Sequence, residues 1–311
     1  MIFFLKQINY NLGYYHMQTI LISGGSGLIG SDLRKYFTEL GYPTRILSRK
    51  PTNKKNNSYY WNIEDKTIDP DAFEGVEVVI NLAGSSIIGG RWTKSRKKEL
   101  THSRVNSTQL LVDTINQQNL PIKHFIQASA MGYYGNSNNQ TITSESPNGN
   151  DFMANLCADW EAASNKLNPT IKKSILRIGL YLSLNGGVYP ILSRLAKFSI
   201  LSAFGNGKMW AGYTHHQEFA NLIHQIIKDK IPADIYNAVG AQPFQMNELM
   251  KCIVQKSGRV NFLPNIPSFI LKLVLGEASA TLLNSYKITS PKLASHNFYQ
   301  YQEIDQAIQS L

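Results

Sequence analysis

The 311-residue sequence contains only two cysteines and no long, uninterrupted hydrophobic run. Two cysteines are too few for a disulfide framework or a cysteine-rich zinc module, and they suit the reducing cytoplasm. The best candidate for a membrane helix, residues 266–283, is interrupted by Lys272, Gly276 and Glu277. It therefore lacks the roughly 18–20 uncharged apolar residues that a membrane span requires. We expect a cytoplasmic protein without a membrane partner.

Acidic residues are also scarce, because 21 Asp and Glu stand against 31 Lys and Arg, which gives a net charge of +10. Such a charge favours an anionic partner: nucleic acid, a membrane surface or a phosphorylated small molecule. We do not expect nucleic acid, because no aromatic-rich strand platform or recognition-helix motif accompanies the basic residues. A hydrophobic content of 43% and a charged content of 17% exclude a disordered chain and predict a sizeable core.

Strands and helices alternate from residue 18 onward, which predicts an α/β protein with a doubly wound parallel sheet over residues 17–240. A small, mostly helical C-terminal domain is expected over residues 258–311, and residues 1–16 are either an extension or a mis-assigned start before Met17. The expected strands are 19–23, 44–47, 76–82, 124–128, 174–178 and 235–239. The expected helices are 31–40, 94–117, 152–165, 218–228, 246–256, 268–275 and 278–285. Residues 50–58 are expected to form a polar loop.

A glycine-rich turn joins the first expected strand to the first helix, with glycines at Gly24, Gly27 and Gly30. The first glycine permits a tight turn, the second lets the backbone approach a pyrophosphate, and the third lets helix and strand pack closely. The free N–H groups at the N-terminus of the helix would then hold the pyrophosphate, and Leu28 and Ile29 of the turn are expected among the cofactor contacts. This placement predicts a dinucleotide-binding fold of the Rossmann kind, and the alternative is a purely structural turn.

The end of the second strand predicts which dinucleotide binds. A fold that selects NAD places Asp or Glu there for the ribose hydroxyls, whereas one that selects NADP places Arg there for the 2′-phosphate. No carboxylate is present in residues 44–50, where Ser48, Arg49 and Lys50 offer a hydroxyl and two cations. These residues predict NADP(H) as the cofactor, and the alternative is an ordinary basic loop.

Together with later motifs, these residues resemble the extended short-chain dehydrogenase/reductases of the epimerase-like branch. The turn has that branch's GxxGxxG form, residues 81–84 are similar to the segment that lines the adenine and ribose, and residues 128–135 are similar to the segment with the catalytic serine. Further motifs within residues 91–161 and 264–293 narrow the resemblance to an atypical subgroup, the epimerase family proteins with a small C-terminal domain of unknown function. The resemblance implies further cofactor contacts from Leu82, Ala83, Gly84, Ala128 and Ser129.

The same resemblance identifies what the sequence lacks. Typical members transfer a proton with a Tyr whose pKa is lowered by a Lys four residues later. Here Met153 stands in place of that Tyr, Cys157 in place of the Lys, and Arg104 in place of a supporting Asn, while Ser129 is retained to orient the substrate. The atypical subgroup is similar on these points. The sequence therefore has the cofactor-binding elements without the usual proton-transfer pair.

Four residues remain candidates for catalysis: Ser129, Cys157, Arg104 and Tyr133. A cation such as Arg104 could lower the pKa of the Cys157 thiol from its ordinary value of about 8.5, or Cys157 could be a small buried helix residue. One of Tyr133 and Tyr134 could place a hydroxyl in the site, or both could simply pack.

Other charged residues have open alternatives. Arg177, at the end of a strand, either faces the nicotinamide edge or forms a surface ion pair, and Glu161 is expected to cap a helix or pair. His215, His216 and Glu218 suggest a metal at first sight, but nothing else clusters with metal-ligand spacing, so no metal site is predicted. The basic residues within 91–98 form either an electrostatic collar for an anionic substrate or a solvated helix face.

Two functions follow from these observations. The first is an NADP(H)-dependent oxidoreductase or epimerase that acts on a small polar, anionic substrate such as a nucleotide sugar or a phosphorylated compound. The second is a binding protein that senses NADP(H) without turnover. In either case the expected partner is a small molecule, and the expected state is a monomer or a homodimer.

Overall fold

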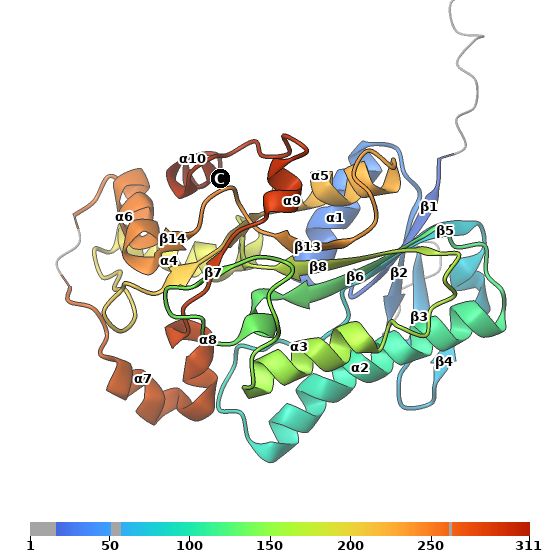
Figure 1. Cartoon of the computed structure of the whole chain (residues 1–311), viewed down its shortest axis with the longest axis horizontal. Helices are drawn as coiled ribbons and strands as arrows, with labels where there is room; N and C mark the ends of the chain where they lie inside the picture. Colours follow the sequence, from blue (N-terminus) through green and yellow to red (C-terminus); the bar gives the residue numbers. More distant parts are fainter. Residues whose placement is uncertain (1–16, 51–56, 261–262) are drawn as a thin grey trace, which may run out of the picture.

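A computed structural model describes residues 17–50, 57–260 and 263–311, and its centre is an eight-stranded sheet in the order β13-β8-β6-β5-β1-β2-β3-β4 (Figure 1). All neighbouring strands are parallel except β3 and β4, which are antiparallel. The chain adds strands in one direction from β1 to β4 and in the other from β5 to β13. Ligands in such sheets bind beyond the carboxyl ends of the strands where the order reverses, which here is between β1 and β5. The strands are β1 Thr19–Ser23, β2 Thr44–Ser48, β3 Ser58–Asn62, β4 Thr67–Ile68, β5 Val76–Asn81, β6 His124–Ala130, β8 Lys172–Ile178 and β13 Ile235–Ala238.

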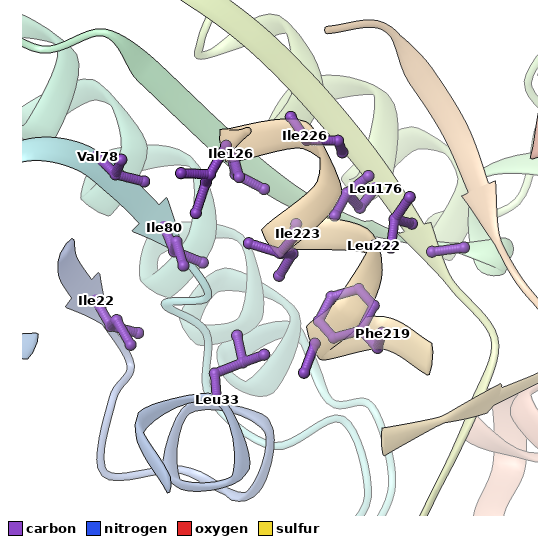
Figure 2. Packing of buried hydrophobic residues seen from close by; sticks show 14 of the residues in the cluster. Ile22, Leu33, Val78, Ile80, Ile126, Leu176, Phe219, Leu222, Ile223 and Ile226 are labelled. Atoms are coloured by element: carbon purple, nitrogen blue, oxygen red, sulfur yellow. The ribbon is translucent and has the colours of Figure 1, made fainter. Parts of the chain in front are cut away.

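Helices cover both faces of this sheet, α1 (Leu28–Glu39) and α5 (His216–Ile227) on one side and α2 (Lys94–Gln117) and α3 (Phe152–Ala162) on the other (Figure 1). Successive residues of β1 point to opposite faces. Ile20 and Ile22 pack in the cluster under α1 and α5, which Figure 2 shows, whereas Leu21 packs in the cluster under α2. Each such buried side chain stabilises the fold by about 2 kcal/mol. Burial on both faces explains why the strands are continuous apolar runs.

The C-terminal part of the chain forms a third core with a helix from the middle of the sequence. α4 (Val188–Lys197), α6 (Met246–Ser257) and α10 (Ile304–Gln309) share one buried cluster that includes Leu192, Leu249 and Ile308. α7 (Ser268–Leu275) contacts mainly the following 3-10 helix η4 (Gly276–Ser279). The remaining elements are β7 Thr141–Ile142, β9 Leu180–Ser183, β10 Gly186–Gly187, β11 Trp210–Ala211, β12 Tyr213–His215, β14 Phe244–Gln245, β15 Lys287–Ile288, α8 Ala280–Leu283, α9 Pro291–Ala294, and the 3-10 helices η2 Pro70–Phe73 and η3 Met131–Tyr134.

The predicted fold class, a doubly wound parallel sheet with a helical C-terminal region, is confirmed. β1, α2 and α7 have the predicted bounds, whereas α1 begins at Leu28 because Gly27 is its N-cap and Gly30 lies inside the helix. Strand β3 was not predicted, although Tyr59 and Trp61 are buried on either side of the exposed Tyr60. The domain boundaries at 240 and 258 stay a prediction. Residues 1–16, and 51–56 of the predicted polar loop, lie outside the described residues.

None of the helices within the described ranges is both long and apolar enough to cross a membrane.

Candidate functional site

The glycine turn lies at the carboxyl end of β1, where the strand order reverses. Gly24 has a φ of +71°, and a Cβ on it would lie 2.8 Å from the carbonyl oxygen of Leu82, so no other residue fits there without strain. A Cβ on Gly30 would lie 2.4 Å from the carbonyl oxygen of Gly24. Two of the three motif glycines are therefore required for close packing between the turn, α1 and the end of β5.

Gly27 is the N-cap of α1 in an extended conformation, with φ −77° and ψ 176°. Among the described residues no side chain caps this helix, and no acidic residue lies in its first turn. The amides at the start of α1, including those of Leu28 and Ile29, are thus left for an external acceptor, and the helix dipole favours an anion there. The free amides and the helix dipole both favour the pyrophosphate of a dinucleotide at this position, where these amides would hold it.

Asn81, at the end of β5, connects the two halves of the sheet at this point. Its Oδ1 accepts hydrogen bonds from Ser23 Oγ at 2.5 Å and from the Ala83 amide at 3.3 Å, and its Nδ2 donates to Thr108 and Gln127. This fully buried amide therefore fixes the shape of the Leu82–Gly84 segment, which was expected to contact the cofactor. The sequence analysis assigned no role to Asn81. Its position at the start of the 81–84 segment, which resembles the segment that lines the adenine and ribose, could have indicated one.

Ser48 and Arg49 lie at the end of β2, on the other side of the turn from residues 82–84. The Ser48 hydroxyl accepts a hydrogen bond from the Lys50 amide at 3.2 Å, and Arg49 is exposed. A cation next to a half-buried hydroxyl fits a phosphate monoester.

Arg104, on α2, is buried and lies against Gly84, where an added Cβ would be 3.0 Å from the guanidinium carbon. It donates hydrogen bonds to the carbonyl oxygens of Ser85 and Leu100 and stacks over Trp160. Burial lowers its pKa to about 10, and it forms no ion pair with any described residue. A buried guanidinium without a carboxylate is costly, and an anion from a ligand would offset part of that cost.

Ser129 and Arg177 both bond to the carboxylate of Glu161. Ser129 donates to it at 2.6 Å, while the Nε and Nη2 atoms of Arg177 donate at 2.8 and 2.9 Å. Burial alone would lower the pKa of Arg177, but the hydrogen bonds and charge of Glu161 raise it overall. Glu161 forms an ion pair with Arg177, which is one of the two roles expected for it; the other was to cap a helix. Of the two alternatives for Arg177, the surface ion pair is wrong in its location, because the pair is buried between β8 and α3, and a place at the nicotinamide edge stays a prediction.

The two tyrosines after β6 differ in what their hydroxyls do. Tyr134 is buried; its hydroxyl donates to Asn237 at 2.5 Å, accepts from Arg177 at 2.8 Å, and burial raises its pKa. Tyr133 is half-buried, with the Arg177 guanidinium carbon 3.5 Å from its ring centre. Its hydroxyl has no partner in the described part of the chain. Of the two, only Tyr133 has a hydroxyl that is left for a ligand.

Met153 and Cys157 lie in an apolar cluster on α3 that also contains Trp92 and Ala278. Burial raises the pKa of the Cys157 thiol to about 12, with a further contribution from Glu161 that exceeds the opposing effect of Arg104. Of the two alternatives for Cys157, the structure favours the small buried helix residue over a thiol activated by Arg104. The positions of the usual proton-transfer pair are filled by packed side chains.

The segment that leads into α4 packs against the start of α1. A Cβ on Gly187 would lie 2.9 Å from Cδ2 of Leu28. Asp32, farther along α1, accepts hydrogen bonds from the Tyr181 hydroxyl at 3.1 Å and the Asn185 amide at 2.6 Å. The turn that leads into α4 is thus fixed to the helix of the glycine turn.

The histidines at the start of α5 have structural partners. His215 accepts from the Gln217 amide and contacts Ser310 at the end of α10, while Glu218 accepts from the amides of Gln300 and Tyr301. The described residues contain no group of three or more His, Cys, Asp or Glu that could hold a metal ion.

The basic residues 91–98 bond to the C-terminal helices. Neither the electrostatic collar nor the solvated helix face expected from the sequence included such contacts. Arg91 donates to the carbonyl oxygens of Leu273 and Val274 at the end of α7, and Lys97 pairs with Glu277 at 2.5 Å. These contacts reduce the charge available for a substrate collar.

Comparison with known proteins decides the family. Residues 20–238 match the model of the NAD dependent epimerase/dehydratase family. The chain belongs to this family. An epimerase family protein of Staphylococcus haemolyticus, SH2119, is 30% identical over 95% of this chain and 99% of its own. The chloroplastic SDR39U1 homolog of Arabidopsis thaliana is 26% identical over 94% of this chain and 86% of its own. These relatives confirm the resemblance to the epimerase family proteins.

The human epimerase family protein SDR39U1, isoform 2, was crystallised with NADPH and has a similar fold. It matches 94% of this chain and 98% of its own with a TM-score of 0.86 at 24% identity. This similarity shows that the two proteins share one fold over nearly their whole length.

The structure brings the predicted residues together in two groups. The glycine turn, Ser48, Arg49 and residues 82–84 lie around the ends of β1, β2 and β5, whereas Ser129, Tyr133 and Cys157 lie on or beside β6 and α3. Their roles toward cofactor and substrate stay predictions. Reasoning from sequence missed the buried Glu161–Arg177 pair, because its members are 16 residues apart on different elements.

Proposed function

We propose that this chain binds NADP(H) in preference to NAD(H) and uses it in an oxidoreductase or epimerase reaction on a small polar, anionic substrate. The observation that carries the cofactor assignment is the uncapped N-terminus of α1 beside Ser48 and Arg49, with no carboxylate at the end of β2. The similarity to human SDR39U1, which was solved with NADPH, supports it. The glycine turn, Ser48, Arg49, residues 82–84, Ala128 and Ser129 would hold the cofactor, which supplies hydride transfer when bound.

In this proposal Tyr133 moves the proton, because its hydroxyl is unengaged in the described part of the chain and its ring rests on Arg177. Arg104 holds the substrate's negative charge, and Ser129 orients the reacting oxygen. Ser129 would have to exchange its hydrogen bond to Glu161 for one to the substrate. The substrate could be a nucleotide sugar or a phosphorylated compound, and the protein would act in the cytoplasm as a monomer or homodimer.

A second function, NADP(H) sensing without turnover, is favoured by one observation. Met153 cannot carry a proton, and the Cys157 thiol has a pKa of about 12 in an apolar cluster. The usual acid/base positions are thus inert at neutral pH.

One experiment distinguishes the two functions. Purified protein is incubated with NADPH and a panel of carbonyl compounds, including nucleotide sugars and sugar phosphates, and the absorbance of NADPH is followed. Turnover that falls at least about 100-fold in Tyr133→Phe and Ser129→Ala, with NADPH affinity retained, supports the enzyme. Tight NADPH binding without turnover across the panel supports the sensor. Tighter binding of NADH than of NADPH contradicts the cofactor assignment in both.

A further inference from the structure

A pair of charged residues on the first two turns of α2 lies next to the segment that follows β5. Arg96 donates to Glu99 at 2.5 Å and also to the carbonyl oxygen of Ser86. The Ser85 amide and hydroxyl are bonded in turn to Ser103 on the same helix. The Arg96 side chain is 25% exposed and that of Glu99 is 54% exposed. The pair is thus accessible, and its arginine is held in a defined position by a backbone carbonyl.

The segment after β5, to which Arg96 bonds, and the end of β2 flank β1 on its two sides. The hydrogen bond from Arg96 chiefly lowers the pKa of Glu99, and the Ser85 hydroxyl and the charge of Arg49 lower it further. Ser23 of β1 is paired with Leu47 of β2 on one side and with Asn81 of β5 on the other. Arg49 and the segment beside Arg96 therefore border the glycine turn from its two sides.

We propose that Arg96 is a second cofactor-selecting cation, which binds the 2′-phosphate of NADP(H) with Arg49, and that Glu99 occupies Arg96 until the phosphate replaces it. This inference rests on the proposed NADP(H) binding. A guanidinium accepts a carboxylate or a phosphate with the same planar set of donors, and a phosphate with up to two negative charges is the stronger partner. Because the Arg96–Glu99 pair is exposed, little free energy is lost when it opens.

The arrangement has a consequence for discrimination between cofactors. NAD(H) has no 2′-phosphate, so it gains nothing from Arg96 and leaves the pair with Glu99 intact. NADP(H) gains a second charged contact but must displace the carboxylate. Removal of Arg96 should therefore weaken only NADP(H), whereas neutralisation of Glu99 should strengthen only NADP(H).

The test measures dissociation constants of NADPH and NADH by calorimetry for the wild-type chain, Arg96→Ala, Glu99→Gln and the double variant. Arg96→Ala should weaken NADPH about 10-fold and change NADH less than about twofold, because one charge-assisted contact is lost. Glu99→Gln should tighten NADPH about threefold. The double variant should gain little over Arg96→Ala, because Glu99 acts chiefly through Arg96 and only weakly through Arg49.

Lys98→Ala is the matched control, because it removes the same charge from an exposed position on the same helix. It should change neither affinity by more than about twofold. Thermal unfolding of every variant reports whether the fold is retained. The inference is overturned if Arg96→Ala weakens both cofactors equally or neither. If Arg49→Ala abolishes the preference for NADPH while Arg96→Ala leaves it intact, the proposed function stands and the role of Arg96 alone is wrong.

Discussion

The glycine turn and the α3 region, both at the carboxyl ends of parallel strands, use their polar groups in opposite ways. At the turn, α1 starts without a capping side chain, so backbone amides are left for a ligand. Beside α3, Glu161 bonds to Ser129 and Arg177, and Cys157 is packed among apolar side chains. Parallel strands therefore create the place for a nucleotide, whereas local side chains decide whether acid/base chemistry is available next to it.

The largest expected effect tests whether the α3 region depends on its buried ion pair. Glu161→Gln removes the charge that compensates Arg177 and should lower the free energy of unfolding by about 3 kcal/mol, because an uncompensated buried cation remains. Urea denaturation measures this loss. Asp159→Asn, the same chemical change at an exposed position of α3, should cost less than about 0.5 kcal/mol. Equal losses in the two variants would mean that the Glu161–Arg177 ion pair stabilises the fold no more than an exposed carboxylate does.

The next effect concerns the open amides of the glycine turn. Gly27→Val keeps an allowed backbone conformation at φ −77°, but its side chain would stand at the start of α1. We expect the affinity for both NADPH and NADH to fall at least about 100-fold, near 2.7 kcal/mol, in calorimetry. The thermal midpoint should stay close to that of the wild type. Unchanged affinity would remove the glycine turn from the nucleotide site.

A smaller effect should appear at low pH, away from both regions. Burial, with the neighbouring charge of His216, lowers the pKa of His215 to about 3. Below pH 6.5 the unfolded chain binds a proton that folded His215 does not, so stability falls as the pH is lowered. The loss from this residue is about 2 kcal/mol at pH 5. Urea denaturation from pH 7 to 5 should show a shallower loss for His215→Gln, and identical slopes would contradict the assignment.

The smallest expected effect concerns the reactivity of the Cys157 thiol, which should be very low in the folded protein. Because the thiol is buried with a pKa of about 12, iodoacetamide at pH 7.5 should label it at least about 100-fold more slowly than in the urea-unfolded chain. Mass spectrometry of a Cys252→Ala variant isolates this residue. Labelling at the rate of the unfolded protein would mean that the α3 region opens and that a catalytic thiol is plausible again.

Much of the fold could be predicted because its signals are local. The apolar run of β5 and the length of α2 predicted the bounds of these two elements to within one residue, whereas the start of α1 was predicted three residues too late. β3 was missed because a polar, basic stretch precedes it and its alternation spans only five residues. The glycine turn was similarly readable, since its three motif glycines lie within seven residues, and its binding of a dinucleotide stays a prediction.

The α3 region was less predictable because its interactions join distant residues. Tyr134 and Asn237 are 103 positions apart in the sequence, and Arg91 is more than 180 residues from the carbonyl groups that it contacts. Residue type showed that Met153 cannot titrate. It could not show that burial raises the pKa of the Cys157 thiol by more than the charge of Arg104 lowers it.

The sequence by itself determined the parallel sheet, the glycine turn and the loss of the usual proton-transfer pair, because each depends on residue type and short spacing. Tertiary structure alone decided which charges are paired, which tyrosine hydroxyl is left for a ligand, and how Arg96 and Arg49 come to border one turn. The physical reason is that pKa values and ion pairs depend on burial and on neighbours from other elements, which only the folded chain brings together.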